Sequence, residues 1–171
     1  MTPSSQPEPW LRGPVPGVPA ALMPAAHALL QASEDIERAA MVLSSAELVA
    51  RPGGAASVAF HLKHLAGSLD RLLTYARGEA LDVEQRTALK TEQVDSPSEN
   101  AAPLVRNAQG AIASALDQLR ATSEDTLQVA RQVGRAALPT TVGGLLFHAA
   151  EHAVRHAGQI ITTAKIVRGG G

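Results

Sequence analysis

The sequence contains no cysteine among its 171 residues. This absence excludes disulfide bonds, a thiolate nucleophile and zinc sites built on sulfur. Any bound metal must therefore be held by nitrogen and oxygen atoms.

The chain also lacks an excess of charge of one sign and any long apolar run. Its formal net charge is -1, with 15 basic and 16 acidic residues. No basic surface is therefore expected for nucleic acid or for an anionic membrane face. No stretch approaches the ~20 apolar residues that span a bilayer, and the opening residues do not resemble a secretion signal. We expect a soluble, cytoplasmic protein with neither nucleic acid nor membrane as partner.

The length suits one domain, preceded by a proline-rich arm at residues 1–17. Each proline removes a backbone donor and restricts the residue before it, so the arm should be extended. It is either a disordered tail or an arm anchored by Trp10 and Leu11 on the domain or on a second subunit. We assign residues 18–168 to the folded domain.

Apolar residues recur at helical spacing in four segments of that domain, which predicts an all-α fold. Pro24 is tolerated in the first turn of the first helix, Gly78 ends the second, and Thr140 or Thr141 caps the fourth. The predicted helices cover approximately residues 18–43, 56–76, 104–119 and 142–167.

Two connections in this pattern are long. Residues 79–97 are polar and can carry the chain back along a helix of ~20 residues, about 30 Å long, so that the third helix starts parallel to the second. Short loops would instead make these neighbours antiparallel. Residues 122–139 fit either a short helix or a partly extended segment, and the sequence leaves their conformation open.

Five of the six histidines lie on two of the predicted helices: His61 and His64 on the second, and His148, His152 and His156 on the fourth. Residues four apart share a helix face about 6 Å from each other, so neighbouring rings can converge on one ion. A further imidazole from an adjacent helix would complete the site.

A histidine cluster has structural interpretations as well, such as a polar core or a pH sensor. Burying several imidazoles without partners is costly, however, and protonating them together is repulsive. A metal ion satisfies them all at once. We therefore favour a metal site for the cluster, and a structural, hydrogen-bonded role for the separate His27.

Two segments, SVAFHLKHLAGSLDRLLTYARGE and LLFHAAEHAVRHAGQI, resemble the DinB-like family of metal-binding four-helix bundles. The resemblance implies up-down-down-up topology with the long crossover between the second and third helices. It implies that the metal ligands are His64, His152 and His156, and it leaves supporting roles, beside the metal or in the pocket wall, to His61 and His148. Ala157 stands where many members carry arginine.

Three imidazole ligands leave at least one coordination position open, as in catalytic sites. Such a site suits zinc or nickel first, with manganese, iron, cobalt or copper as alternatives. Gly67 and Ser68 are small enough to leave room above the ion, and Glu151 and Arg155 are expected at the pocket edge or in solvent. No residue stands out as a general base.

The resemblance further implies a metal-dependent enzyme, such as a transferase that uses a low-molecular-weight thiol and a small electrophilic substrate. The metal would lower the pKa of a bound thiol or water. A non-catalytic metal-binding or stress-related interaction module and a metal-dependent hydrolase are the alternatives. Members of this family commonly pair, and the alanine-rich helix faces with the apolar arm also suggest a homodimer.

Overall fold

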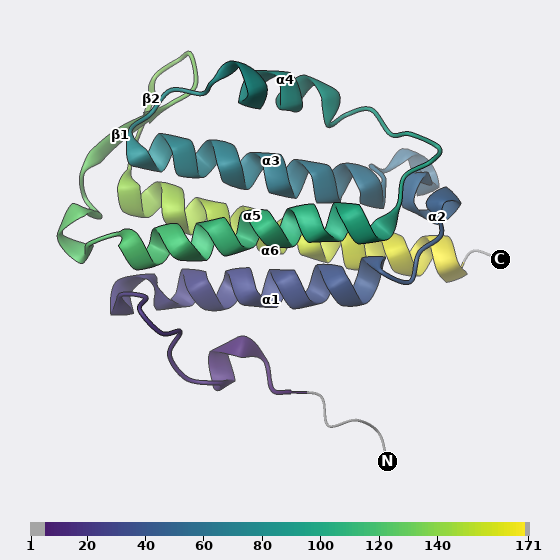
Figure 1. Cartoon of the computed structure of the whole chain (residues 1–171), viewed down its shortest axis with the longest axis horizontal. Coiled ribbons are helices and arrows are strands. Elements are labelled where there is room, and N and C mark those ends of the chain that lie inside the picture. The colour runs from purple at the N-terminus through teal and green to yellow at the C-terminus, as the bar shows by residue number, and fades with distance from the viewer. Residues whose placement is uncertain (1–5, 170–171) are drawn as a thin grey trace.

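Four long helices form the body of the protein in this computed structural model, which describes residues 6–169. They lie side by side along the long axis of the molecule (Figure 1). These helices are α1 (Met23–Ala40), α3 (Val58–Arg77), α5 (Ala101–Ala121) and α6 (Val142–Gly169). The fold is therefore mostly helical, as the periodicity predicts. Within residues 6–169, no helix is both long and apolar enough to cross a membrane.

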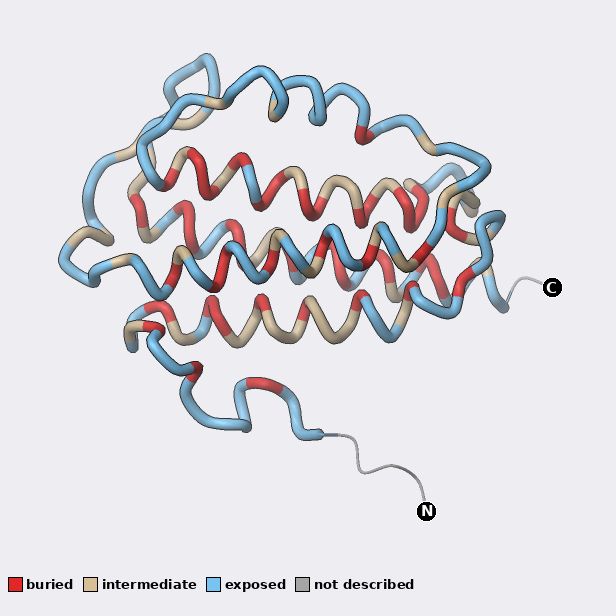
Figure 2. The backbone as a smooth tube through the Cα atoms, viewed as in Figure 1, coloured by how far each residue is buried: buried red, intermediate tan, exposed pale blue. Residues whose placement is uncertain are grey.

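Each long helix buries one apolar stripe between its neighbours, with α1 and α3 each packed against both α5 and α6 (Figure 2). Alanines fill much of this core and allow the helices to approach closely. The large side chains that are fully buried include Leu29, Ile36, Leu62, Leu69, Ile112, Leu146 and Ile160. Side chains that project from these four helices are therefore held on rigid, packed elements.

The helix ends follow the local signals in the sequence. Pro24 lies in the first turn of α1, and the Ser57 hydroxyl accepts a hydrogen bond from Phe60 N at the start of α3. Gly78 ends α3 with a positive φ of 82°, a conformation that favours glycine. At the start of α6, Thr141 Oγ1 accepts from Gly144 N at 3.0 Å, which confirms the predicted cap.

Residues 78–100 form the crossover between α3 and α5, and this connection runs along the length of α3 (Figure 1). It contains a helix that the periodicity does not predict, α4 (Val83–Thr91). Asp82 caps α4: its Oδ1 accepts from Gln85 N, and Gln85 Oε1 accepts from Asp82 N. A second short helix, α2 (Ser45–Val49), has a similar capping box at Ser44 and turns the chain between α1 and α3.

The segment that the sequence leaves open, residues 122–139, is partly extended. After a single 3-10 turn it forms an antiparallel hairpin of β1 (Ala130–Val133) and β2 (Leu138–Thr141). Arg131 Nε donates to Ala76 O at 2.8 Å and holds the hairpin against the end of α3. An extended segment therefore leads directly into α6, the helix that carries three of the histidines.

The proline-rich arm rests on α1, with residues 1–5 outside the described part. Within residues 6–17 it contains one 3-10 turn, at Pro9–Leu11, and otherwise no helix or strand. The predicted anchors Trp10 and Leu11 are 61% and 56% exposed. The arm is held instead by Arg12, whose Nη2 donates to Glu34 Oε2 at 2.9 Å, and by the burial of two valines, Val15 and Val18.

Candidate metal site

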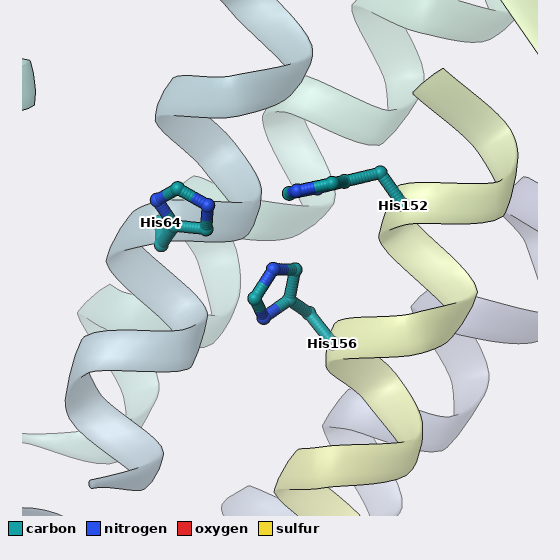
Figure 3. A group of neighbouring side chains, drawn as sticks. All are labelled: His64, His152 and His156. Atoms are coloured by element: carbon teal, nitrogen blue, oxygen red, sulfur yellow. The ribbon is translucent and has the colours of Figure 1, made fainter. Parts of the chain in front are cut away.

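Helices α3 and α6 pack against each other, and three histidines meet where they do so. His64 projects from α3, while His152 and His156, one turn apart, project from α6 toward it (Figure 3). One ring nitrogen of each residue lies within 4.8 Å of the others. The structure thus brings together the three residues that the sequence resemblance selects.

Each of the three rings is oriented by a partner on its Nδ1 atom. His64 Nδ1 lies 2.8 Å from Glu92 Oε1, and His152 Nδ1 lies 3.2 Å from Ser68 Oγ. The Ser68 hydroxyl donates to the Leu65 carbonyl, so its oxygen is left to accept from His152 Nδ1–H. His156 Nδ1 lies 3.0 Å from His61 Nδ1. When His156 donates in this pair, every ring has its Nδ1–H engaged and its Nε2 lone pair free.

The residues therefore fit a metal ion. No hydrogen bond within residues 6–169 reaches Nε2 of His64, His152 or His156. In tetrahedral zinc sites the Zn–N distance is about 2.0–2.1 Å, which places ligand nitrogens about 3.4 Å apart. The ligand nitrogens, all within 4.8 Å of one another, would have to approach each other to reach that value. Neutral imidazoles whose other nitrogen is held by a partner are typical of protein metal ligands.

Burial and neighbouring positive charge keep His152 and His156 of α6 neutral. Desolvation is the largest cause, and the proximity of other histidines adds to it. Together they lower the pKa of His152 to about 4 and the pKa of His156 to about 3. Desolvation likewise lowers the pKa of His61. Protons therefore compete little with a metal for the α6 ligands near neutral pH.

The site is open on one side. His156 is buried, whereas the His64 side chain is 22% exposed and His152 is half-buried. The His64 ring stacks on Phe60, with ring centroids 5.3 Å apart and planes 12° apart. One edge of the cluster, at His64 and His152, is therefore partly exposed to solvent, whereas His156 is buried.

The remaining histidines lie outside the group of three. His61 is buried and contacts His156 through Nδ1. His148, one turn before His152, has a side chain that is 49% exposed and lies 3.3 Å from Glu151. His27 does not belong to the group of three, and its Nε2 bonds the Gly13 carbonyl at 2.9 Å, the structural role expected of it.

The expected roles of Gly67 and Ser68 need correction. Neither simply leaves room above an ion, because Ser68 contacts His152. A Cβ on Gly67 would lie 2.8 Å from Arg71 Nη1 and 2.9 Å from Glu92 Oε2. The glycine thus makes room for an arginine–glutamate pair beside His64.

Sequence reasoning missed Glu92 and Arg71. Glu92 caps the C-terminal end of α4 and belongs to a segment that the sequence shows only as polar. The capping pattern Asp82-x-x-Gln85 could have revealed α4, but nothing in the sequence singles out this carboxylate. Glu151 and Arg155 pair with each other at the exposed edge, as expected.

Comparisons with known proteins agree with this picture. The sequence pattern of the DinB superfamily matches residues 28–160, a range that includes all four long helices in whole or in part and all three histidines. The fold is similar to the crystal structure of a conserved protein from Enterococcus faecalis, with a TM-score of 0.68 and 22% sequence identity. That match covers 86% of this chain and 97% of the other. A comparison with curated proteins found no match. The chain belongs to the DinB superfamily.

Proposed function

We propose that His64, His152 and His156 bind one divalent transition metal ion and that the protein is a metal-dependent enzyme. One observation carries the proposal: three imidazoles from two helices, each with Nδ1 engaged, leave three ring nitrogens free around one point. Three ligands of this kind leave a position for water or substrate. Zinc or nickel suits the all-imidazole donor set best, and manganese, iron, cobalt and copper are the alternatives.

We extend the proposal to the helix order, up-down-down-up. The crossover is long enough to run beside α3, so that α3 and α5 start at the same end of the bundle. That order brings α3 and α6 together, and it lets the chain between α3 and α5 contribute to the site. Membership of the DinB superfamily is consistent with this arrangement.

The reaction we favour is transfer of a low-molecular-weight thiol to a small electrophile. When bound, the metal supplies Lewis-acid chemistry that lowers the pKa of a thiol or water. The chain has no cysteine, so the thiol must come from solution through the open edge. The histidines hold their Nε2 atoms toward that position, and their Nδ1 partners prevent the rings from turning away.

This proposal is tested by turnover with metal, thiol and electrophile varied separately. Metal-loaded protein should consume a small thiol together with an activated aryl halide, and His152→Ala should abolish the reaction. His27→Ala is the matched control, because its ring bonds the arm and not the cluster. Turnover of activated esters without thiol would instead identify a hydrolase, and metal-loaded protein without turnover would indicate a binding module.

We also propose that the chain forms a homodimer, with the exposed side of α6 as part of the interface. Phe147 and Val154 lie two turns apart on α6 and are 67% and 42% exposed. They line a largely apolar depression shared with Pro24 and Ala28 of α1. Apolar surface of this kind marks association sites more often than isolated exposed residues do.

A further inference from the structure

Residues 78–100 contain a single buried residue, and it is a carboxylate. Glu92 is 4% exposed, whereas every other residue of this crossover is exposed or half-buried, including all of α4. Figure 2 shows the crossover as an outer segment that is coloured almost entirely as exposed or intermediate. Apolar burial therefore does not explain why this segment places Glu92 inside the protein.

The contacts of Glu92 explain its burial. Its Oε1 atom lies 2.8 Å from His64 Nδ1, and its two oxygens accept from Arg71 Nη1 and Nη2, each at 3.3 Å. The Arg71 side chain is itself buried, so both charges are paired within the protein. A buried charge is tolerated only when it is paired and hydrogen-bonded. The absence of a side chain at Gly67 gives this pair its space.

A carboxylate at this position constrains the chemistry of His64. It can only accept a hydrogen bond, so the ring must carry its proton on Nδ1, and the lone pair of the neutral ring is then on Nε2. Stacking on Phe60 restrains the plane of the same ring. The two contacts together leave His64 one orientation and one tautomer, and these expose Nε2 toward His152 and His156.

We propose that Glu92 is the positioning residue of the metal site, with Arg71 holding it in place. This inference rests on the proposed metal site. It makes α4 and the crossover part of the site, although none of their residues belongs to the group of three histidines. Removing the carboxylate frees His64 to exchange tautomers and to rotate, and partners of this kind typically change metal affinity 10- to 100-fold.

A second carboxylate in the crossover provides a matched control. Asp95 is half-buried as a residue, although its side chain is only 9% exposed, and it pairs with Lys63 and Arg51. It contacts no histidine and holds the crossover at the start of α3 through Ser57. Asp95→Asn should therefore weaken the contacts of Asp95 with Lys63 and Arg51 while leaving the Glu92–His64 contact in place.

The experiment compares the parent, Glu92→Ala, Glu92→Gln and Asp95→Asn. Zinc affinity is measured by competition with a chromophoric chelator, and the His64 tautomer is read from imidazole ¹⁵N shifts of metal-free protein. We expect about 10- to 100-fold weaker zinc binding in Glu92→Ala. Glu92→Gln should lie between Glu92→Ala and the parent, because its amide oxygen can still accept from Nδ1–H. Asp95→Asn should match the parent.

The two readouts separate failure of this inference from failure of the proposed function. Parent protein that binds no zinc would overturn the metal site, and the tautomer measurement would still decide whether Glu92 fixes His64. Parent-like zinc affinity in Glu92→Ala, an equal loss in Asp95→Asn, or an unchanged His64 tautomer in Glu92→Ala would overturn the role of Glu92.

Discussion

Acid should destabilise the metal-free protein through the buried histidines of α6. In the unfolded chain a histidine gains its proton near pH 6.5. In the folded protein desolvation lowers the pKa of His156 to about 3 and that of His152 to about 4. Between these values the unfolded state binds protons that the folded state excludes. The free energy of unfolding therefore falls as the pH drops below about 6.5, and it is fully retained only above that pH.

The size of this effect follows from linkage. Each proton taken up by the unfolded chain alone lowers the free energy of unfolding by about 1.4 kcal/mol per pH unit. His156 is 7% exposed, so its window extends from about pH 6.5 down to its folded pKa of about 3. Replacing His156 with glutamine removes this proton uptake. The slope of the free energy of unfolding against pH should therefore fall by up to about 1.4 kcal/mol per pH unit.

Urea unfolding of metal-free protein at several values between pH 7.5 and 4.5 measures this slope directly. The parent should lose stability steadily below pH 6.5, and His156→Gln should lose it less steeply. Imidazole chemical shifts of His152 and His156 provide a second readout, and both should stay neutral down to about pH 5. Titration of either ring near pH 6.5, or identical slopes in parent and variant, would show that burial does not keep these histidines neutral in the folded protein.

Three further changes test other parts of the structure. Gly67→Ala should weaken zinc binding, measured by chelator competition, because the new Cβ would displace the Arg71–Glu92 pair; unchanged affinity would show that the pair adapts. Ile36→Ala should lower the free energy of unfolding by about 2–5 kcal/mol in urea titrations, because Ile36 is fully buried, and a change below 1 kcal/mol would contradict this core. Phe147→Glu should convert a dimer to monomer in light scattering, and an unchanged mass would exclude this face as the interface.

The long helices were predictable because their apolar residues recur at helical spacing, and these are the residues that the fold buries. The stripes containing Leu29, Leu62, Ile112 and Leu146 repeat over five or more turns, and tertiary packing only confirms what each segment already favours. The start of α6 at Val142 was also predictable, because threonines that can cap a helix come directly before it. Periodicity of this kind predicts where the helices lie in the sequence, but it does not predict which helices pack against each other.

The shorter elements were not predictable in the same way. α4 contains no buried residue, so it leaves no apolar period, and only its capping box at Asp82 signals a helix. The hairpin of β1 and β2 has four-residue strands, too short to show a clear alternation. Its conformation is decided by contacts with α3, such as that of Arg131.

The candidate site was partly predictable for a related reason. The spacing of His152 and His156 places them on one helix face, and the family resemblance adds His64. The side chains that orient these rings are not marked locally: Glu92 lies 28 residues from His64 along the chain and reaches it only through the crossover. Contacts of that kind depend on tertiary structure, which a single sequence does not display.

We propose that three histidines from α3 and α6 hold one metal ion. Elemental analysis of protein purified without chelator and without metal-affinity steps tests it most directly, beside His152→Ala prepared in the same way. We expect about one transition metal ion per parent chain and a large loss in the variant. A parent that contains no metal even after incubation with zinc or nickel, or a variant that retains a full equivalent, would contradict it.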